Sequence, residues 1–192
     1  MSLARVVRKE LAVIILTVCG VLSTIAISYL LRHLDGLRDL AMADQADFIG
    51  FVIYGLAISL IASASREMRA RDTAIMILGA TIIWGVFIES GDRAGMIRFL
   101  LFAAATVYMT RLADRVWGKA AGWRLLGGAA GPAFACLLLG LGYSAIATKA
   151  AGTGAPAGLM TGATWGFSLG LAVGLGLSIG GELLKWMSKD GS

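Results

Sequence analysis

One serine of this sequence has the spacing of a hydrolase nucleophile. Ser168 lies in the stretch Gly166-Phe-Ser-Leu-Gly170, which matches the G-x-S-x-G pattern. That pattern needs a strand-to-helix turn and a histidine base, whereas this stretch is apolar and the only histidine, His33, lies beside Arg32. We therefore predict no catalytic residue here and expect that the protein is not an enzyme.

The two cysteines offer no metal or redox chemistry by their spacing. Cys19 and Cys136 both lie in apolar stretches, and neither has a second cysteine or a histidine at ligand spacing. A bound haem would usually need histidines on facing helices, and the chain has one histidine. We predict no metal and no cofactor, and we interpret His33 as solvated rather than as a pH sensor.

Four charged residues lie close together between two apolar stretches: Glu89, Asp92, Arg93 and Arg98. Only Arg98 lies more than one turn inside an apolar stretch, where a charge costs at least about 2.5 kcal/mol. A pairing of Arg98 with Glu89 or Asp92 would satisfy both partners. We interpret this group as a structural ion pair first, and as a gate or substrate site second.

The composition assigns most of the chain to a membrane. Of the 192 residues 58% are apolar and 15% are charged, against about a quarter charged in soluble proteins. The net charge of +5 is spread in short groups between apolar blocks, without the basic run or stacking aromatic residues that nucleic acid binding needs. We predict contact with membrane lipid and no binding of nucleic acid.

Six apolar stretches approach the roughly 20 residues that a helix needs to cross the hydrocarbon core. They cover residues 11–31, 48–65, 73–88, 95–109, 125–147 and 158–177. The third and fourth are short unless their helices extend past the flanking charges. Because backbone groups inside lipid must find partners within their own segment, the sequence predicts an all-α membrane protein of about six transmembrane helices in one domain, residues 1–192.

The distribution of lysine and arginine predicts how these helices are oriented across the membrane. With the N-terminus in the cytoplasm, twelve of the 17 fall on the cytoplasmic side, where positively charged loops are retained. We therefore expect both termini in the cytoplasm, and the Ala- and Gly-rich composition is typical of a bacterial inner-membrane protein. Arg111 and Arg115 share one face of a basic stretch, which suits contact with anionic lipid headgroups, but a basic loop anchored at the interface by Trp117 explains the same residues.

Glycines gather in the second half of the chain. Seventeen of the 26 lie between Gly118 and Gly181, and six of them recur at every fourth position. These six are Gly154, Gly158, Gly162, Gly166, Gly170 and Gly174. Such a row lets another backbone approach closely, so the fifth and sixth helices should be tightly packed. Because the row drifts by about 40° per step, we expect the sixth helix to meet two partners or to wrap around one.

The glycine row has two interpretations. The first, which we favour, is packing of the sixth helix within its own bundle, since small-residue interfaces commonly join membrane helices. The second is contact between subunits, which predicts that Gly166→Leu dissociates an assembly. Loss of folding with an unchanged number of subunits would favour the first.

Pro132 lies near the start of the fifth predicted helix. Proline removes one backbone donor and clashes with the preceding turn, so we predict a kink at this position. Interrupted helices often mark binding sites in transporters, because freed carbonyl groups can face a substrate. Since Pro132 lies within about two turns of the helix start, we prefer a structural bend.

Two functions remain, from different classes. The first is a non-catalytic multi-pass membrane subunit that assembles through its glycine-rich helices, with copies of itself or with other membrane proteins, in a larger inner-membrane complex. It explains both the glycine row and the absence of a recognisable catalytic or metal-binding motif. The alternative is a small channel or facilitator-type transporter for a solute or ion, with the group from Glu89 to Arg98 at its outer mouth. No span carries the mid-membrane carboxylate that an ion-coupled carrier normally needs.

Overall fold

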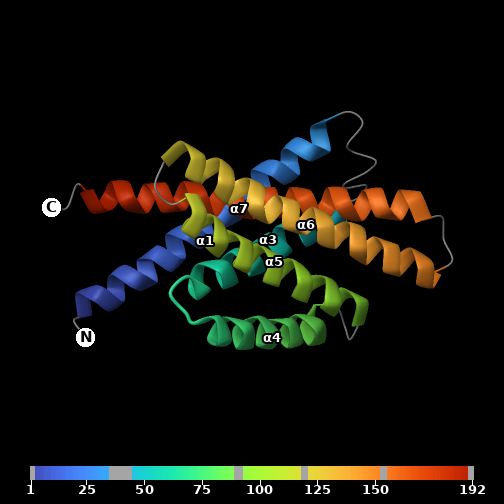
Figure 1. The fold of residues 1–192 in the computed structure, drawn as a ribbon, viewed down its shortest axis with the longest axis horizontal. Coiled ribbons are helices and arrows are strands. Elements are labelled where there is room, and N and C mark those ends of the chain that lie inside the picture. Colours follow the sequence, from blue (N-terminus) through green and yellow to red (C-terminus); the bar gives the residue numbers. More distant parts are fainter. Residues whose placement is uncertain (1–2, 35–44, 89–92, 118–120, 152–154, 190–192) are drawn as a thin grey trace.

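A computed structural model describes residues 3–34, 45–88, 93–117, 121–151 and 155–189 (Figure 1). Its elements are α1 (Leu3–His33), α3 (Gln45–Ser65), α4 (Ala70–Phe87), α5 (Arg93–Trp117), α6 (Ala121–Ala151) and α7 (Ala155–Lys189). No strand occurs in these ranges. All six helices are long and apolar enough to cross a membrane, which confirms the prediction of an all-α multi-pass membrane protein.

Several helices continue past the apolar stretches that predicted them. The fourth stretch ends at residue 109, but α5 continues to Trp117, and the sixth ends at 177, but α7 continues to Lys189. The apolar pattern reports contact with lipid, whereas helical hydrogen bonding continues through charged residues at headgroup level. With 35 residues, α7 is about 52 Å long, so it extends well beyond a hydrocarbon core of about 30 Å.

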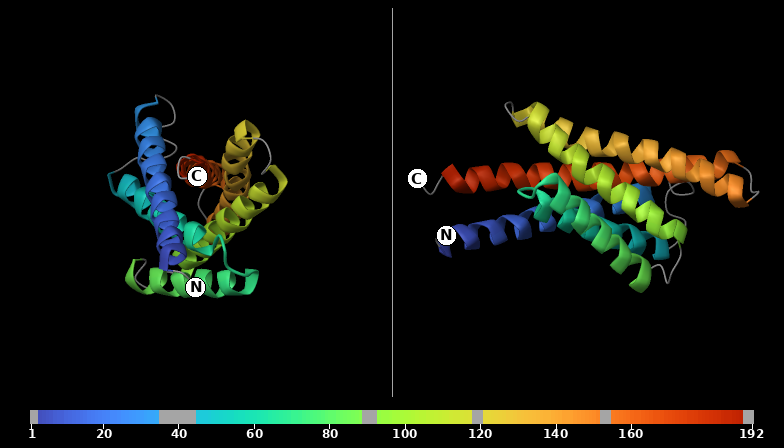
Figure 2. Two further views of the ribbon diagram at one scale, coloured as in Figure 1. Left: turned by 90° about the vertical axis from the view of Figure 1, so that its left-hand side faces the viewer. Right: turned by 60° about the horizontal axis from the view of Figure 1, so that its bottom comes forward.

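The central helix of the bundle is α7. Figure 2 shows it between α1 and α6, and it also contacts α3 and α5, whereas α4 packs on α3 and α5 at the outside. The first turn of α1 and the last turn of α7 lie at the same end of the bundle (Figure 1), as an even number of crossings requires. We call this end the inner end, because positively charged segments predict it to be cytoplasmic, and the opposite one the outer end.

Three glycines of the predicted row pack against α6 of the same chain. A Cβ added at Gly170 would lie 2.5 Å from the carbonyl oxygen of Pro132, and one at Gly174 would lie 2.5 Å from that of Gly128. Gly166 likewise faces the carbonyl of Cys136. The two helices run antiparallel, so each step of four residues on α7 meets a step of four on α6. No side chain larger than hydrogen fits between these backbones.

The other three glycines of the row are placed less completely, and Gly154 lies outside the described residues. The carbonyl oxygen of Gly162 lies against Gly140 of α6, so the same interface continues toward the outer end. Gly158 lies in α7, but its surroundings are outside the part of the chain that the structure describes.

A second glycine pair of α7 contacts α1. Gly176 lies against the backbone of Cys19 and Gly20, with an added Cβ 2.5 Å from the Cys19 carbonyl oxygen, and Gly180 packs on Leu16. The central helix therefore meets α6 on one side and α1 on the other. The last helix thus meets two partners, but not through the drift of the row: the row stays on α6 from Gly162 to Gly174, and the contact with α1 is made by Gly176 and Gly180.

The crossing of α1 and α3 also depends on glycine. Gly20 of α1 lies against the side chain of Ser59, and Gly55 of α3 lies against that of Thr24. The two pairs are reciprocal, since each helix supplies one glycine and one small hydroxyl residue. The Oγ of Ser59 is buried and has no hydrogen-bond partner among the described residues, so this crossing is held by shape rather than by polar contacts.

Pro132 lies inside α6, which continues through it from Ala121 to Ala151. Because residue i of a helix donates to residue i−4, the missing N–H of Pro132 frees the carbonyl group of Gly128. That carbonyl faces Gly174 of α7, where Cα–H groups can approach it. The freed carbonyl thus takes part in helix packing.

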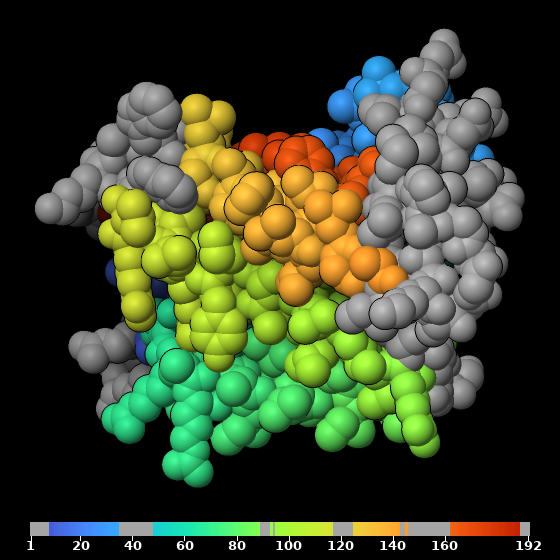
Figure 3. Space-filling model, turned by 45° about the vertical axis from the view of Figure 1, so that its right-hand side comes forward, coloured from blue at the N-terminus to red at the C-terminus, as the bar shows by residue number. Residues whose placement is uncertain are grey.

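The outer surface of the bundle is apolar. On the face shown in Figure 3, α4, α5 and α6 lie one above the other and form a continuous surface. Ile75, Ile82 and Phe134 are each more than half exposed. Exposed side chains of this kind are suited to acyl chains, which cover the sides of a membrane protein.

Candidate functional site

A small polar cavity lies near the inner end of the bundle, with a volume of about 30 Å³. This is room for one or two water molecules. Side chains or backbone from α1, α3, α5, α6 and α7 line it. Its polar lining residues are Ser63, Arg66, Thr110, Arg111, Asp114 and Ser178. Because five helices converge on it, the cavity is a feature of the whole bundle and not of one helix pair.

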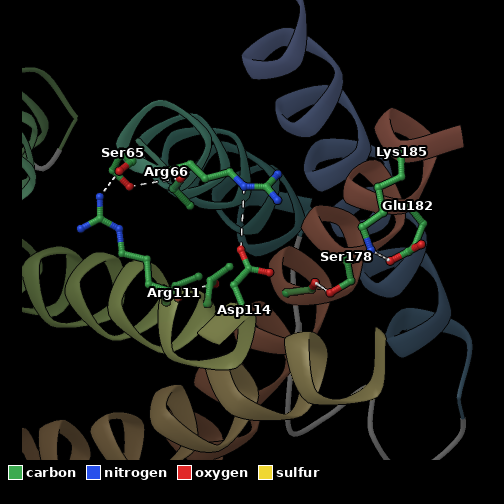
Figure 4. A network of polar contacts seen from close by, with 11 residues as sticks. Ser65, Arg66, Arg111, Asp114, Ser178, Glu182 and Lys185 are labelled. Carbon is green, nitrogen blue, oxygen red and sulfur yellow. Dashed lines mark hydrogen bonds and ion pairs between the residues drawn. The ribbon is translucent and has the colours of Figure 1, made fainter. Parts of the chain in front are cut away.

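Arg111 joins α5 to the end of α3. Its Nη2 donates hydrogen bonds to the carbonyl oxygens of Ser65, the last residue of α3, and of Met68 at 3.1 Å (Figure 4). A cation is favoured at the C-terminal end of a helix, where carbonyl groups lack partners. Arg111 is therefore turned toward the α3–α4 turn, and its contact with lipid headgroups stays a prediction.

Arg66 and Asp114 face each other across the cavity. Figure 4 shows the two side chains pointing together from the α3–α4 turn and from α5, with Nε of Arg66 3.8 Å from Oδ2 of Asp114. Both side chains are more than a third exposed, at 39% and 36%, so this ion pair is weak. The terminal nitrogens of Arg66 make no hydrogen bond with any described residue. Arg66 is thus held at one atom only.

Each of the three hydroxyl groups that line the cavity donates its hydrogen bond within its own helix. Ser63, Thr110 and Ser178 each donate to the carbonyl oxygen four residues earlier in the same helix, at 2.6, 2.6 and 2.8 Å. A hydroxyl whose proton is used retains its lone pairs. These oxygens therefore remain as acceptors, whereas the two arginines are the donors of the cavity.

A larger chamber adjoins the small cavity. It has a volume of about 440 Å³ and lies between α1 and the end of α3. Leu16, Ser63 and Arg66 line both spaces, so the two are neighbours and Arg66 lies between them. At the rim of the chamber Lys9 forms an ion pair with Glu67, which ties the start of α1 to the α3–α4 turn.

A cluster of aromatic rings packs between the helices farther from the inner end. The rings of Trp84 and Phe99 are stacked with centroids 4.4 Å apart, and Tyr54 meets Trp165 edge to face at 5.0 Å. Phe102 lies 5.7 Å from the Trp165 ring. We call these five residues the aromatic cluster. It combines residues of α3, α4, α5 and α7, and none of the five lines the small cavity.

Arg98 lies against this aromatic cluster. Its Nε donates to the hydroxyl oxygen of Tyr54 at 3.2 Å, and its guanidinium carbon lies 5.6 Å from the Tyr54 ring centroid and 5.9 Å from that of Trp165. Both distances suit a cation–π interaction. Glu89 and Asp92, its predicted partners, lie outside the described residues. Sequence reasoning did not find Tyr54 and Trp165, because they lie on other helices 44 and 67 positions away.

The thiols of the chain are both free cysteines. Cys136 is buried, with its Sγ 3.4 Å from the Oγ1 of Thr106, and Cys19 lies in α1. Within the described ranges, histidine, cysteine and acidic side chains form no group of three that could hold a metal ion. Neither cysteine lines the polar cavity.

Six helices that are long and apolar enough to cross a membrane define the class of this molecule, a multi-pass membrane protein. The comparisons with known proteins add no narrower assignment, since no family model, curated protein or solved structure matches the chain. Any further statement about function must therefore follow from the arrangement of the residues.

Proposed function

We propose that this protein is a small facilitator-type transporter that takes up a polar solute from the cytoplasm through the cavity between Arg66 and Asp114. The observation that supports this proposal is the contrast between the two halves of the bundle. The inner half holds a polar cavity that shares lining residues with a chamber of about 440 Å³, whereas the aromatic cluster packs four helices together farther from the inner end. This is the arrangement expected for a transporter that is open inward and closed outward.

The cavity is more polar than helix packing requires. Packing of membrane helices is satisfied by small residues, as in the contact between Gly170 and Pro132. Ionisable residues inside a bundle carry a cost and usually mark a pathway. Here Arg66, Arg111 and Asp114 all face one space, and this coincidence favours a solute site over a purely structural cluster.

In this proposal the protein is not an enzyme and lies in a bacterial inner membrane. Ser178, the serine of α7 that lines the cavity, donates its hydrogen bond to the carbonyl oxygen of Gly174, and no histidine is among the residues that line this space. A nucleophile would need a base within hydrogen-bond reach. The cytoplasmic orientation rests on the distribution of lysine and arginine.

The second candidate is a non-catalytic subunit of a larger inner-membrane complex. It is favoured by the inner end of α7, where Leu183, Trp186 and Met187 are 42%, 63% and 44% exposed. A cluster of exposed apolar side chains there is suited to a second copy of the chain or another membrane protein. Because Gly166, Gly170 and Gly174 face α6, such an association would use the outward faces of α6 and α7.

The test is solute flux in liposomes that contain only this protein. Shrinkage and recovery of the liposomes is followed by light scattering under gradients of urea, glycerol, glycine and potassium phosphate. Gly181 lines the cavity and has open space at its Cβ position, so Gly181→Val should fill the cavity and stop the flux. Gly79 also has open space but lies on α4, away from the cavity, so Gly79→Val is the matched control.

Each outcome decides between the candidates. Flux that is lost in Gly181→Val and kept in Gly79→Val supports transport. If no gradient relaxes faster than in empty liposomes, the transport proposal is wrong. In that case the mass of the complex purified gently from native membranes would show whether other polypeptides accompany the chain in a fixed ratio.

A further inference from the structure

We infer that the chamber beside Arg66 binds a small zwitterion, whose anionic oxygens contact Arg66 and whose ammonium group contacts Glu10. The inference rests on the proposed function, since it names the chemical class of the solute that enters the same site. Three features of the chamber support it: the balance of its charges, the unused hydrogen-bonding groups on its two walls, and the apolar residues beneath them.

The lining of the chamber is balanced in charge. Its four ionisable residues are two cations and two anions: Lys9, Arg66, Glu10 and Glu67. Lys9 and Glu67 already form an ion pair with each other, so Arg66 and Glu10 remain as one positive and one negative group. A ligand with a single charge would be attracted by one of these groups and repelled by the other. A zwitterion can satisfy both.

Both remaining groups have unused hydrogen-bonding capacity. Glu10 is exposed and forms no hydrogen bond or ion pair with any residue that the structure describes. The contact of Arg66 with Asp114 uses Nε, and Figure 4 shows the terminal nitrogens of Arg66 pointing away from Arg111. The guanidinium group therefore offers its two Nη atoms to a carboxylate or phosphate. Glu10 offers its carboxylate oxygens to an ammonium group.

Glu10 and Arg66 line the chamber from opposite walls. Glu10 belongs to α1, and Arg66 directly follows the last residue of α3. Their chain neighbours Lys9 and Glu67 are in contact, so the two walls lie close together here. With a volume of about 440 Å³ between the walls, a molecule of the size of an amino acid has room to reach both groups.

The deeper lining indicates what the rest of the ligand is like. Ala12, Val13, Leu16 and Ala64 line the chamber farther from the inner end than its charged residues do. Binding pockets commonly combine such apolar walls with a few polar groups that fix the orientation of the ligand. The chamber therefore suits a zwitterion with an apolar body. Free leucine and the lipid phosphatidylethanolamine both have this chemistry, because each carries an ammonium group close to anionic oxygens and an apolar part.

L-leucine is the probe for a free zwitterion. The full chain is placed in nanodiscs of phosphatidylglycerol, whose headgroup has no ammonium group, and binding is measured by isothermal titration calorimetry. Isocaproate and isoamylamine have the apolar body of leucine with only the negative or only the positive charge. We expect each of them to bind roughly tenfold more weakly than leucine, because one charge-assisted contact is lost.

Two substitutions separate the two contacts. Glu10→Gln should weaken leucine binding roughly tenfold without weakening isocaproate, which has no ammonium group to lose a partner. Arg66→Gln should weaken leucine by a similar factor without weakening isoamylamine, which has no carboxylate. Asp72→Asn and Arg71→Gln are the matched controls, because both residues are exposed near the start of α4 and neither lines the chamber.

The headgroup of phosphatidylethanolamine carries the same pair of charges, and a second arm separates the two sources. Leucine affinity that does not change when phosphatidylethanolamine is mixed into the discs identifies a free solute as the ligand. Leucine binding that is absent from the mixed discs, with phosphatidylethanolamine retained in native mass spectrometry by the wild type but not by Glu10→Gln, identifies a headgroup. Either result supports a zwitterion between Glu10 and Arg66.

Equal leucine affinity of the wild type, Glu10→Gln and Arg66→Gln would overturn the inference, as would isocaproate or isoamylamine that binds as tightly as leucine. Absence of both leucine binding and phosphatidylethanolamine retention would overturn it as well. This failure is distinct from failure of the proposed function. Relaxation of a glycerol or urea gradient without zwitterion binding would leave transport standing with a different solute. Zwitterion binding without any flux would leave the site standing without transport.

Discussion

The guanidinium group of Arg111 caps the end of α3 by donating a hydrogen bond to the carbonyl oxygen of Ser65. The bond joins residues 46 positions apart in the sequence. A second bond, to the carbonyl oxygen of Met68, makes the same side chain a clamp on the α3–α4 turn. The guanidinium group of Arg111 therefore has a structural role, and the residue also lines the small cavity.

Replacement of Arg111 should destabilise the fold. We expect Arg111→Gln to lower the free energy of unfolding by about 1–3 kcal/mol, because the carbonyl groups at the end of α3 lose a charged donor. The measurement is unfolding in mixed micelles of dodecyl maltoside and sodium dodecyl sulfate, followed by circular dichroism. Arg115→Gln, at an exposed position of the same helix, should leave the midpoint unchanged. Equal midpoints for both variants would contradict the clamp.

The glycine row gives a prediction that separates packing from assembly. Gly166→Leu should destabilise the fold by more than the roughly 1–3 kcal/mol of ordinary overpacking, since the added side chain meets the α6 backbone at Cys136. The number of subunits, measured by light scattering of the detergent complex, should not change. Gly79→Leu, where an added Cβ meets no atom within 4 Å, should fold normally. A folded Gly166→Leu protein with fewer subunits would instead assign the row to an assembly.

The crossing of α1 and α3 predicts coupling between Gly20 and Ser59. Gly20→Ala should destabilise the protein by about 1–3 kcal/mol, because its Cβ would overlap the Ser59 side chain. In a Ser59→Gly background the same substitution should cost less, with a coupling free energy of roughly 0.5–3 kcal/mol. Unfolding midpoints of the wild type, the two single variants and the double variant give this value. Additive effects would show that the two residues do not share one contact.

Arg98 allows a prediction about how the aromatic cluster closes the outer side of the proposed transporter. Arg98→Gln removes the cation that lies over Tyr54 and Trp165, an interaction worth about 0.5–2 kcal/mol. We expect solute flux in liposomes to rise several-fold because the aromatic cluster opens more often. Arg93→Gln, at an exposed position of α5, should leave flux unchanged. A folded Arg98→Gln protein with no flux would make Arg98 part of the solute path.

The number and type of the helices could be predicted from the sequence because lipid imposes one simple requirement. A segment that crosses it must be long, apolar and hydrogen-bonded within itself, and six stretches meet that requirement in this chain. The ends of α5 and α7 could not be predicted in this way, because charged residues such as Arg115 and Lys185 leave lipid without ending the helix.

The glycine row showed by itself that α7 has a close neighbour, since only hydrogen at every fourth position permits such contact. It did not identify the neighbour, because any helix backbone offers carbonyl groups. The tertiary structure selected α6, whose Cys136, Pro132 and Gly128 match the row in antiparallel register. The cavity likewise depends on the tertiary structure. Arg66 and Asp114 are 48 positions apart, and only the packing of five helices brings them to one space, because no local spacing relates residues on different helices.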